Sequence, residues 1–252
     1  MKKVALLFVC LNSPYWPYLK QVIEDCREHF LKGHQVDYFS WTDIPPEVNY
    51  GATVFETDPA PWPMPTLMRY TLFLRQEEQL SEYDYIFYLD ADMRVVADIT
   101  DEIMGEGLTA ALHPMYAFRP GLRFPLEPNP NSTAYIKVPQ HYFAGGFQGG
   151  RSKDFIAAMK VMKKNIDTDF KNNYVARWND ESHWNRYLFD NPPAVILDQT
   201  YIYPDSLIDS YYVPIWGYKP EPKIITLTKP FTVSKEGGEA ARNFAEDLSK
   251  LK

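Results

Sequence analysis

The first forty residues carry two kinds of hydrophobic pattern. Residues 4–11 form an apolar run about as long as a buried strand. Apolar side chains then recur at helical spacing as far as Phe30, and Gly33 is expected to end that helix. Residues 35–40 alternate as a strand does. A strand, a helix and a second strand in this order are typical of a parallel crossover, so the sequence predicts a doubly wound α/β sheet.

The next segment changes character. Residues 43–65 contain six prolines, which predict an extended surface loop. Thr66 is expected to cap a helix that runs to about Leu80. Residues 83–89, apolar and rich in aromatic side chains, have the composition of a buried central strand.

Later elements follow the same reasoning. Strands are expected at 108–112, 134–136 and 142–147, and a helix is expected where Phe155, Met159, Met162 and Ile166 recur at offsets of four, three and four. Residues from Lys223 onward are charged and predict a surface tail. No repeat or change in composition divides the chain, so residues 1–252 are expected to form a single domain.

Charge and cysteine content narrow the class of protein. The net charge is −7 and the chain has no run of lysine and arginine, which argues against a nucleic-acid partner. Cys10 and Cys26 are too few for a disulfide framework and are expected in the core. Met1 to Lys3 before an apolar run resembles a signal peptide, but no small-x-small cleavage site follows. No stretch approaches the roughly 20 apolar residues of a membrane span. A cytoplasmic location, or loose contact with a membrane face, is expected.

An acidic pair follows the predicted strand at 83–89. Asp90 and Asp92 are two residues apart, so in extended backbone both carboxylates face the same side and can hold one hard cation with a diphosphate. Ligands of open α/β sheets bind beyond the carboxyl ends of the strands, where this pair lies. A plain turn is the alternative. A second pair, Asp167 and Asp169, follows a helix and is discounted.

The segment 178–183 combines several groups useful for sugar binding. Trp178 offers an apolar face for stacking, Asp180 a carboxylate for hydroxyl groups, and Glu181 a carboxylate that can stabilise positive charge at an anomeric carbon. The alternative is structural. In it, Asn179 or Asp180 is the N-cap of a helix that ends near Phe189, and Glu181 lies in its first turn.

Longer motifs connect these features to a known family. Residues 142–150 (YFAGGFQGG) and 178–185 (WNDESHWN), supported by 112–114 and 132–136, resemble glycosyltransferase family 6, the blood-group A and B transferases and α-1,3-galactosyltransferases. The likeness extends from about residue 15 to 242. It implies a GT-A fold, which is a Rossmann-like, nucleotide-sugar-binding mixed sheet flanked by helices. It also implies a retaining α-1,3 transfer of galactose or N-acetylgalactosamine from a UDP-sugar to a galactoside oligosaccharide.

The resemblance also assigns roles on the donor side. Asp90 and Asp92 match the family's metal-binding aspartates, which implies Mn²⁺ or Mg²⁺. Arg69 matches a donor-binding arginine, with a helix-surface cation as its alternative, and Tyr15 falls near the uridine. Asp180 matches a residue that contacts the donor sugar, and Glu181 matches the glutamate proposed as nucleophile or charge stabiliser.

On the acceptor side, His113 and Trp178 correspond to acceptor-binding residues, with core or loop packing as the alternative for His113 and for Tyr15. Lys235 and Arg242 resemble a basic pair in a tail, about 223–252, that closes over the diphosphate. Their alternative is a solvated tail.

The donor sugar is read in this family through the stretch Ala144, Gly145 and Gly146. Glycine at the third position removes side-chain bulk near the second carbon of the sugar. The resemblance therefore predicts UDP-GalNAc over UDP-galactose.

Departures from the family pattern concern mainly the acceptor side. Asn179 replaces a histidine, residues 115–117 replace Gly-Phe-Tyr, and prolines interrupt 125–131. The chain begins at the catalytic domain, which suits a bacterial or viral member without a membrane anchor. Two other classes are weighed. An inactive carbohydrate-binding protein of this fold would have lost Glu181 or the acidic pair, and a nucleotidyltransferase would have a glycine-rich basic loop after the first strand.

Overall fold

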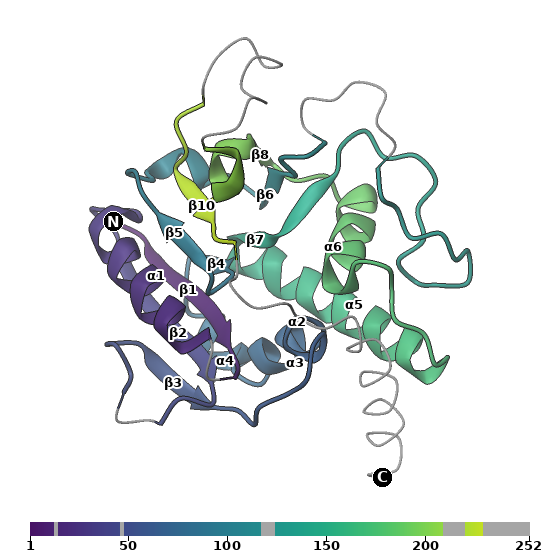
Figure 1. Cartoon of the computed structure of the whole chain (residues 1–252), viewed down its shortest axis with the longest axis horizontal. Helices are drawn as coiled ribbons and strands as arrows, with labels where there is room; N and C mark the ends of the chain where they lie inside the picture. Colours follow the sequence, from purple (N-terminus) through teal and green to yellow (C-terminus); the bar gives the residue numbers. More distant parts are fainter. Residues whose placement is uncertain (13–14, 46–47, 117–123, 209–219, 229–252) are drawn as a thin grey trace.

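The computed structural model describes residues 1–12, 15–45, 48–116, 124–208 and 220–228. Within them lies a seven-stranded sheet in the order β3-β2-β1-β4-β7-β6-β8 (Figure 1). In that order the strands are β3 (Thr53–Glu56), β2 (Gln35–Thr42), β1 (Lys3–Cys10), β4 (Tyr85–Leu89), β7 (Phe143–Arg151), β6 (Leu108–Leu112) and β8 (Val195–Leu197).

The strand directions create one edge where many loops meet. β3, β2, β1 and β4 run parallel, β7 is antiparallel to both of its neighbours, and β8 is parallel to β6. The last residues of six strands and the first residues of β7 therefore lie at the same edge, which we call the carboxyl edge. The prediction of a mixed α/β sheet flanked by helices is confirmed.

Helices cover both faces of this sheet, and β1 shows the pattern that requires it. Val4, Leu6 and Phe8 pack in one hydrophobic core, whereas Ala5 and Leu7 pack in the other, because alternate side chains of a strand point to opposite faces. Helix α1 contributes to the first core and α2 to α6 to the second (Figure 1). The helices are α1 (Trp16–His29), α2 (Met64–Leu67), α3 (Arg69–Leu74), α4 (Glu77–Leu80), α5 (Ser152–Lys171) and α6 (Asn179–Asp190), with short 3₁₀ turns at Asp101–Ile103, Gln199–Tyr201 and Asp205–Leu207.

The predicted opening is confirmed with small shifts. β1 and β2 pair in parallel and α1 connects them, but the helix ends at His29, four residues before Gly33. Gly33 has a φ of 93° and lies in the turn that leads into β2. Cys10 and Cys26 are both buried and free, as predicted.

Two expectations for the proline-rich segment and its helix are wrong. The segment contains β3, which adds to the sheet beside β2, because only its middle, free of proline, can supply backbone N–H groups to a neighbour. The expected helix is three short helices, α2, α3 and α4. Thr66 lies inside α2, where its hydroxyl donates to the carbonyl of Pro63 instead of capping a helix.

The strand expected at 134–136 is also absent from the described residues, which form turns there. Asp169 explains the difference, because its carboxylate accepts hydrogen bonds from the Ser132 hydroxyl (2.6 Å) and the Thr133 N–H (2.9 Å). The discounted pair, Asp167 and Asp169, therefore has a structural role at its second member, and it lies inside α5 instead of after a helix.

A second, three-stranded sheet contains β5 (Met93–Val95), β10 (Ile224–Thr226) and β9 (Tyr203–Pro204). The interpretation of everything after Lys223 as a surface tail is therefore wrong for its first residues. Ile224 is fully buried in the core shared with α1. Residues 229–252 lie outside the described residues.

We expect Ile224→Ala to lower the free energy of unfolding by about 2–4 kcal/mol, because it removes buried methyl and methylene groups and leaves a cavity. Ile225→Ala, at the half-buried neighbouring position, is the matched control and should cost about 1 kcal/mol or less. Urea denaturation of the two variants measures the difference. Equal losses would contradict the placement of Ile224 in the core.

Candidate functional site

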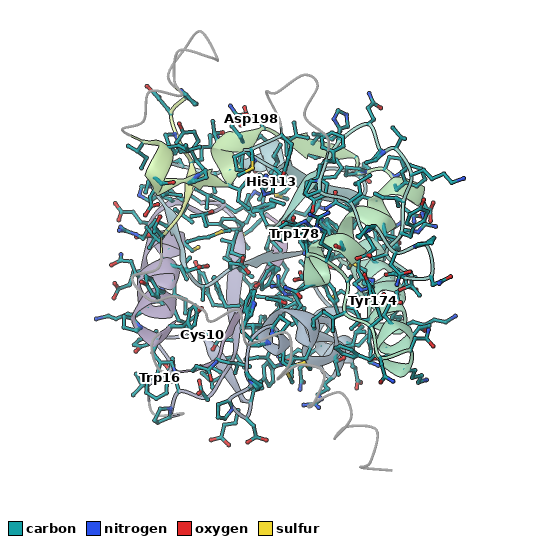
Figure 2. The ribbon with its side chains drawn as sticks, turned by 45° about the vertical axis from the view of Figure 1, so that its right-hand side comes forward. Cys10, Trp16, His113, Tyr174, Trp178 and Asp198 are labelled. Carbon is teal, nitrogen blue, oxygen red and sulfur yellow. The ribbon has the colours of Figure 1, made fainter. Side chains whose placement is uncertain are left out.

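Loops at the carboxyl edge surround a cavity of about 270 Å³. It is lined by the end of β1, by the segment that contains α2, and by the residues that follow β4. The lining residues include Tyr15, Trp62, Arg69, Asp90 and Asp92. The structure thus brings together four residues that the sequence assigned to the donor and its metal: Tyr15, Arg69, Asp90 and Asp92. In Figure 2, Cys10, which also lines the cavity, lies on the side of the N-terminal strands, and Trp178 and His113 lie toward the later elements.

Arg69 is a buried cation between two carboxylates. Its side chain is 3% exposed, which rules out the alternative of a helix-surface cation. Guanidinium nitrogens lie 3.4 Å from Asp90 Oδ1 and 3.3 Å from Asp180 Oδ2, and the group stacks over the ring of Tyr88. Burial alone would lower the pKa of Arg69, but the two carboxylates and neighbouring tyrosines raise it above the usual value. Arg69 therefore holds the acidic residues of two separate elements together.

Asp90 and Asp92 both line the cavity, but residues 91 and 92 form a turn after β4 instead of the extended backbone expected from the sequence. The Tyr88 hydroxyl donates to Asp90 Oδ1, and the Asp90 N–H donates to the Gly146 carbonyl across the sheet (3.0 Å). A Cβ built on Gly146 would lie 2.8 Å from Asp90 Oδ2, so the glycine keeps that side of the carboxylate free of side-chain atoms. Two carboxylates suit a hard cation that completes its shell with phosphate oxygens and water, and the residues present therefore fit Mn²⁺ or Mg²⁺.

Two carboxylates are a small set of ligands for a metal ion. Among the described residues, no group of three or more histidine, cysteine, aspartate and glutamate side chains is arranged to hold a metal by itself. A cation at Asp90 and Asp92 would therefore need ligands from a substrate.

Glu181 lies in the first turn of α6 and faces the start of β7. Its carboxylate accepts hydrogen bonds from the Tyr142 hydroxyl (2.7 Å) and the Gly145 N–H (2.8 Å). Burial raises the pKa of Glu181 to about 7, although these two donors favour the charged form and limit the rise. A carboxyl group held in this way can be ionised near neutral pH. Because it is already fixed and removed from water, little solvent has to reorganise when positive charge develops beside it.

Asp180 precedes Glu181 and points toward Arg69. It is 4% exposed, and burial raises its pKa to about 6 against the opposing charge of Arg69. The Gln148 amide nitrogen lies 3.4 Å from Asp180 Oδ2. The structural alternative is wrong in making Asn179 or Asp180 the N-cap of α6, although Glu181 does lie in the first turn, as that alternative has it. Trp178 is the N-cap residue and makes no side-chain cap, so the side chain of Asp180 is committed to the site rather than to the helix end.

The predicted acceptor residues differ in exposure. Trp178 is 44% exposed at the start of α6, whereas burial lowers the pKa of His113 to about 4, so that this imidazole is neutral near pH 7. The His113 ring packs against Tyr116 and Tyr142, with centroids 5.0 and 5.7 Å apart. Tyr142 thereby joins this aromatic group to Glu181.

Glu127 was not singled out by the sequence. It is 3% exposed, and its carboxylate accepts hydrogen bonds from the Arg177 N–H (2.6 Å), the Asn129 N–H (2.8 Å) and the Tyr174 hydroxyl. It ties the proline-rich segment to the residues just before Trp178. A lone glutamate among prolines carries no periodic signal, so only tertiary structure reveals this role.

The remaining predicted residues are easily placed. Ala144, Gly145 and Gly146 follow Phe143, the first residue of β7, at the carboxyl edge. Gly145 lies beside Glu181 and Gly146 beside Asp90. Tyr15 directly precedes α1 and lines the cavity. Lys235 and Arg242 lie outside the described residues. No helix in the described part of the chain is both long and apolar enough to cross a membrane.

Comparison with known proteins identifies the family of the chain. The model of glycosyltransferase family 6 matches residues 4–213. An O-antigen biosynthesis glycosyltransferase of Escherichia coli is 26% identical over 81% of this chain and 88% of its own length. Histo-blood group ABO system transferase 1 of Rattus norvegicus is 31% identical over 80% of this chain, and globoside α-1,3-N-acetylgalactosaminyltransferase 1 of Gallus gallus is 29% identical over 88%.

The chain spans less than two thirds of those two animal relatives, 61% and 64% respectively. The match to the family model nevertheless covers most of the described residues, including every strand of the large sheet and the segment that carries Asp180 and Glu181. The resemblance read from the motifs is confirmed, and a nucleotide-sugar donor and a glycan acceptor follow from it. The chain belongs to glycosyltransferase family 6 and is a glycosyltransferase.

Proposed function

We propose that this protein transfers N-acetylgalactosamine, or galactose, from a UDP-sugar to a galactoside glycan by a metal-dependent, retaining α-1,3 reaction. The observation that carries the proposal is the buried arrangement in which Arg69 joins Asp90 to Asp180, with Glu181 next to Asp180 in the chain. It supports a donor whose diphosphate lies near Asp90 and whose sugar lies near the first turn of α6.

Asp90 and Asp92 would hold the divalent cation. When bound, the cation neutralises charge on the diphosphate and so makes UDP a better leaving group. Arg69, already between Asp90 and Asp180, can add positive charge beside the same diphosphate, and Tyr15 and Trp62 can flank the nucleotide at the mouth of the cavity. These contacts bind and orient the donor.

Glu181 would act on the sugar. As the bond to UDP breaks, positive charge develops at the anomeric carbon, and a carboxylate on the face of the ring stabilises it by attack or by charge alone. Hydrogen bonds from Tyr142 and Gly145 fix the carboxylate in place, and Asp180 can accept hydrogen bonds from sugar hydroxyls. Retention follows if the acceptor then enters from the side that UDP leaves.

The donor sugar is proposed to be N-acetylgalactosamine. The glycine at 146 supports this, as do relatives named globoside α-1,3-N-acetylgalactosaminyltransferase 1 from four animals, Gallus gallus and Homo sapiens among them. The glycine has a second cause, because a Cβ there would also lie 2.4 Å from Met93 Cε and would crowd Asp90. A cytoplasmic location, with possible peripheral contact to a membrane, stays part of the proposal.

Removal of divalent metal should abolish transfer. We expect exhaustive chelation to reduce the transfer rate at least 100-fold and added Mn²⁺ to restore it, because Arg69 alone cannot offset the charge of a diphosphate beside Asp90 and Asp92. Asp92→Asn should weaken Mn²⁺ activation, and Asp167→Asn, in the discounted pair, should not. Full activity in chelated protein would contradict the metal-dependent mechanism.

Glu181→Gln should lower the turnover number at least 100-fold, since the amide cannot balance developing positive charge. The variant also tests the environment of the carboxyl group. The pKa of Glu181 is raised from 4.5 to about 7 in the folded protein, so its stabilising contribution is complete below pH 4.5 and is lost as pH rises through 7. Glutamine does not titrate.

Between pH 5 and pH 8, therefore, the parent should lose about 2 kcal/mol of unfolding free energy that Glu181→Gln does not lose. Thermal or urea unfolding at the two pH values measures this difference. Asp190→Asn, at the exposed end of α6, is the control and should change neither rate nor this pH dependence. Transfer as fast as the parent by Glu181→Gln would overturn its catalytic role.

A direct comparison of UDP-GalNAc with UDP-galactose tests the donor assignment. With Mn²⁺ and an array of galactoside acceptors, we expect higher kcat/KM for UDP-GalNAc by about tenfold or more, because an unfilled space for an acetamido group is worth on the order of 1–3 kcal/mol. A clear preference for UDP-galactose would defeat the assignment while leaving the chain a glycosyltransferase.

A further inference from the structure

Gln148 is a polar side chain at a position where an apolar one is typical. It lies in β7, paired with Tyr88 of β4 on one side and Ala110 of β6 on the other, and it is 0% exposed. A buried amide is costly unless its oxygen and both N–H groups find partners. The partners of Gln148 therefore indicate what the residue does.

Two of those partners belong to the candidate site. The Gln148 amide nitrogen donates to the Gly145 carbonyl (2.9 Å) and lies 3.4 Å from Asp180 Oδ2. Its oxygen accepts a hydrogen bond from the Tyr70 hydroxyl (2.8 Å). Both N–H groups are thus directed at the site, and the oxygen is satisfied from α3.

Both backbone polar groups of Gly145, which belong to two successive peptide planes, are held by the site. The Gly145 N–H donates to Glu181 Oε2 (2.8 Å), and its carbonyl accepts from Gln148 and, at 3.3 Å, from Arg69 Nη1. Because Gly145 has no side chain to restrict its backbone, loss of the bond to its carbonyl would let the residue rotate and shift its N–H, one of the two donors that orient the Glu181 carboxylate. Gln148 also restrains Asp180, the residue just before Glu181. One amide therefore contacts the Asp180 carboxylate directly and the Glu181 carboxylate through Gly145.

We propose that Gln148 is a positioning residue of the transfer reaction, whose amide fixes the Gly145 carbonyl and the Asp180 carboxylate and thereby orients Asp180 and Glu181 toward the donor sugar. This rests on the function proposed above for those two carboxylates. Gln148 does not line the cavity, so its effect falls on the rate of transfer and not on binding of the nucleotide.

A purely structural explanation is that Gln148 only satisfies the buried hydroxyl of Tyr70. Tyr70→Phe separates the two ideas, because it removes the hydroxyl and leaves both site-directed bonds of Gln148 in place. Tyr70→Phe/Gln148→Met removes both partners of that bond at once and leaves no unpaired hydroxyl, so the double variant is expected to fold. Tyr70→Phe/Gln148→Leu replaces it if the Met variant is unstable.

The experiment measures kcat for transfer from UDP-GalNAc and Kd for UDP, both with Mn²⁺, in folded parent and variants. Tyr70→Phe should stay within about threefold of the parent in both quantities. Tyr70→Phe/Gln148→Met should lose about 10- to 100-fold in kcat, as expected when a hydrogen bond to a charged group is lost and reacting groups are misplaced by a fraction of an ångström. Its Kd for UDP should change less than about threefold.

Three results would overturn the positioning role: kcat near that of the parent in both variants, equal large losses of kcat in both, or a Kd for UDP that weakens in step with kcat. Each requires an active parent. A parent that binds UDP but transfers no sugar from either donor would instead overturn the proposed function, and with it this role, so the two failures are distinguishable.

Discussion

The structure of the site depends on one buried cation. Arg69 reaches Asp90 from one side and Asp180 from the other, and it does so where its side chain is almost entirely removed from water. A buried charge without partners is strongly unfavourable, so removal of Arg69 would leave Asp90 and Asp180 without a compensating cation. Arg69 is one positive charge between two carboxylates, so Arg69, Asp90 and Asp180 together carry excess negative charge. A divalent cation at Asp90 and Asp92 would offset it.

The fold explains how residues so distant in sequence reach this cation. Asp90 follows β4, Gly145 and Gly146 begin β7, and Asp180 starts α6, and all of these meet because β7 runs antiparallel to β4. The hydrogen bond from Asp90 N–H to the Gly146 carbonyl fixes the stretch proposed to read the donor against the pair proposed to bind the metal. The Glu181 carboxylate is oriented in a similar way, because Tyr142 and Gly145, which both donate to it, lie close together at the start of β7.

Much of this was predictable from local patterns. The acidic pair after an apolar strand and the cluster at 178–183 stood out by residue type and spacing, but each also allowed a structural explanation, and their roles came from the resemblance to the family. β1, α1, β2, β6 and α5 followed from the hydrophobic pattern. The surroundings of the site were not predictable in the same way. Gln148 sits inside an apolar run and Glu127 among prolines, and each acquires its role only through partners distant in sequence. β3 and β10 were missed because each is a short strand stabilised by a neighbour and not by its own pattern.

The central claim is spatial: Asp90 and Asp92 bind the cation that holds a diphosphate, and Glu181 lies beside the anomeric carbon of the attached sugar. Crystals soaked with Mn²⁺ and a non-hydrolysable UDP-GalNAc analogue test it most directly, through anomalous diffraction at the manganese edge. The account predicts a manganese peak between Asp90 and Asp92, with the sugar against Asp180 and Glu181. A manganese ion and nucleotide bound away from these side chains would contradict it.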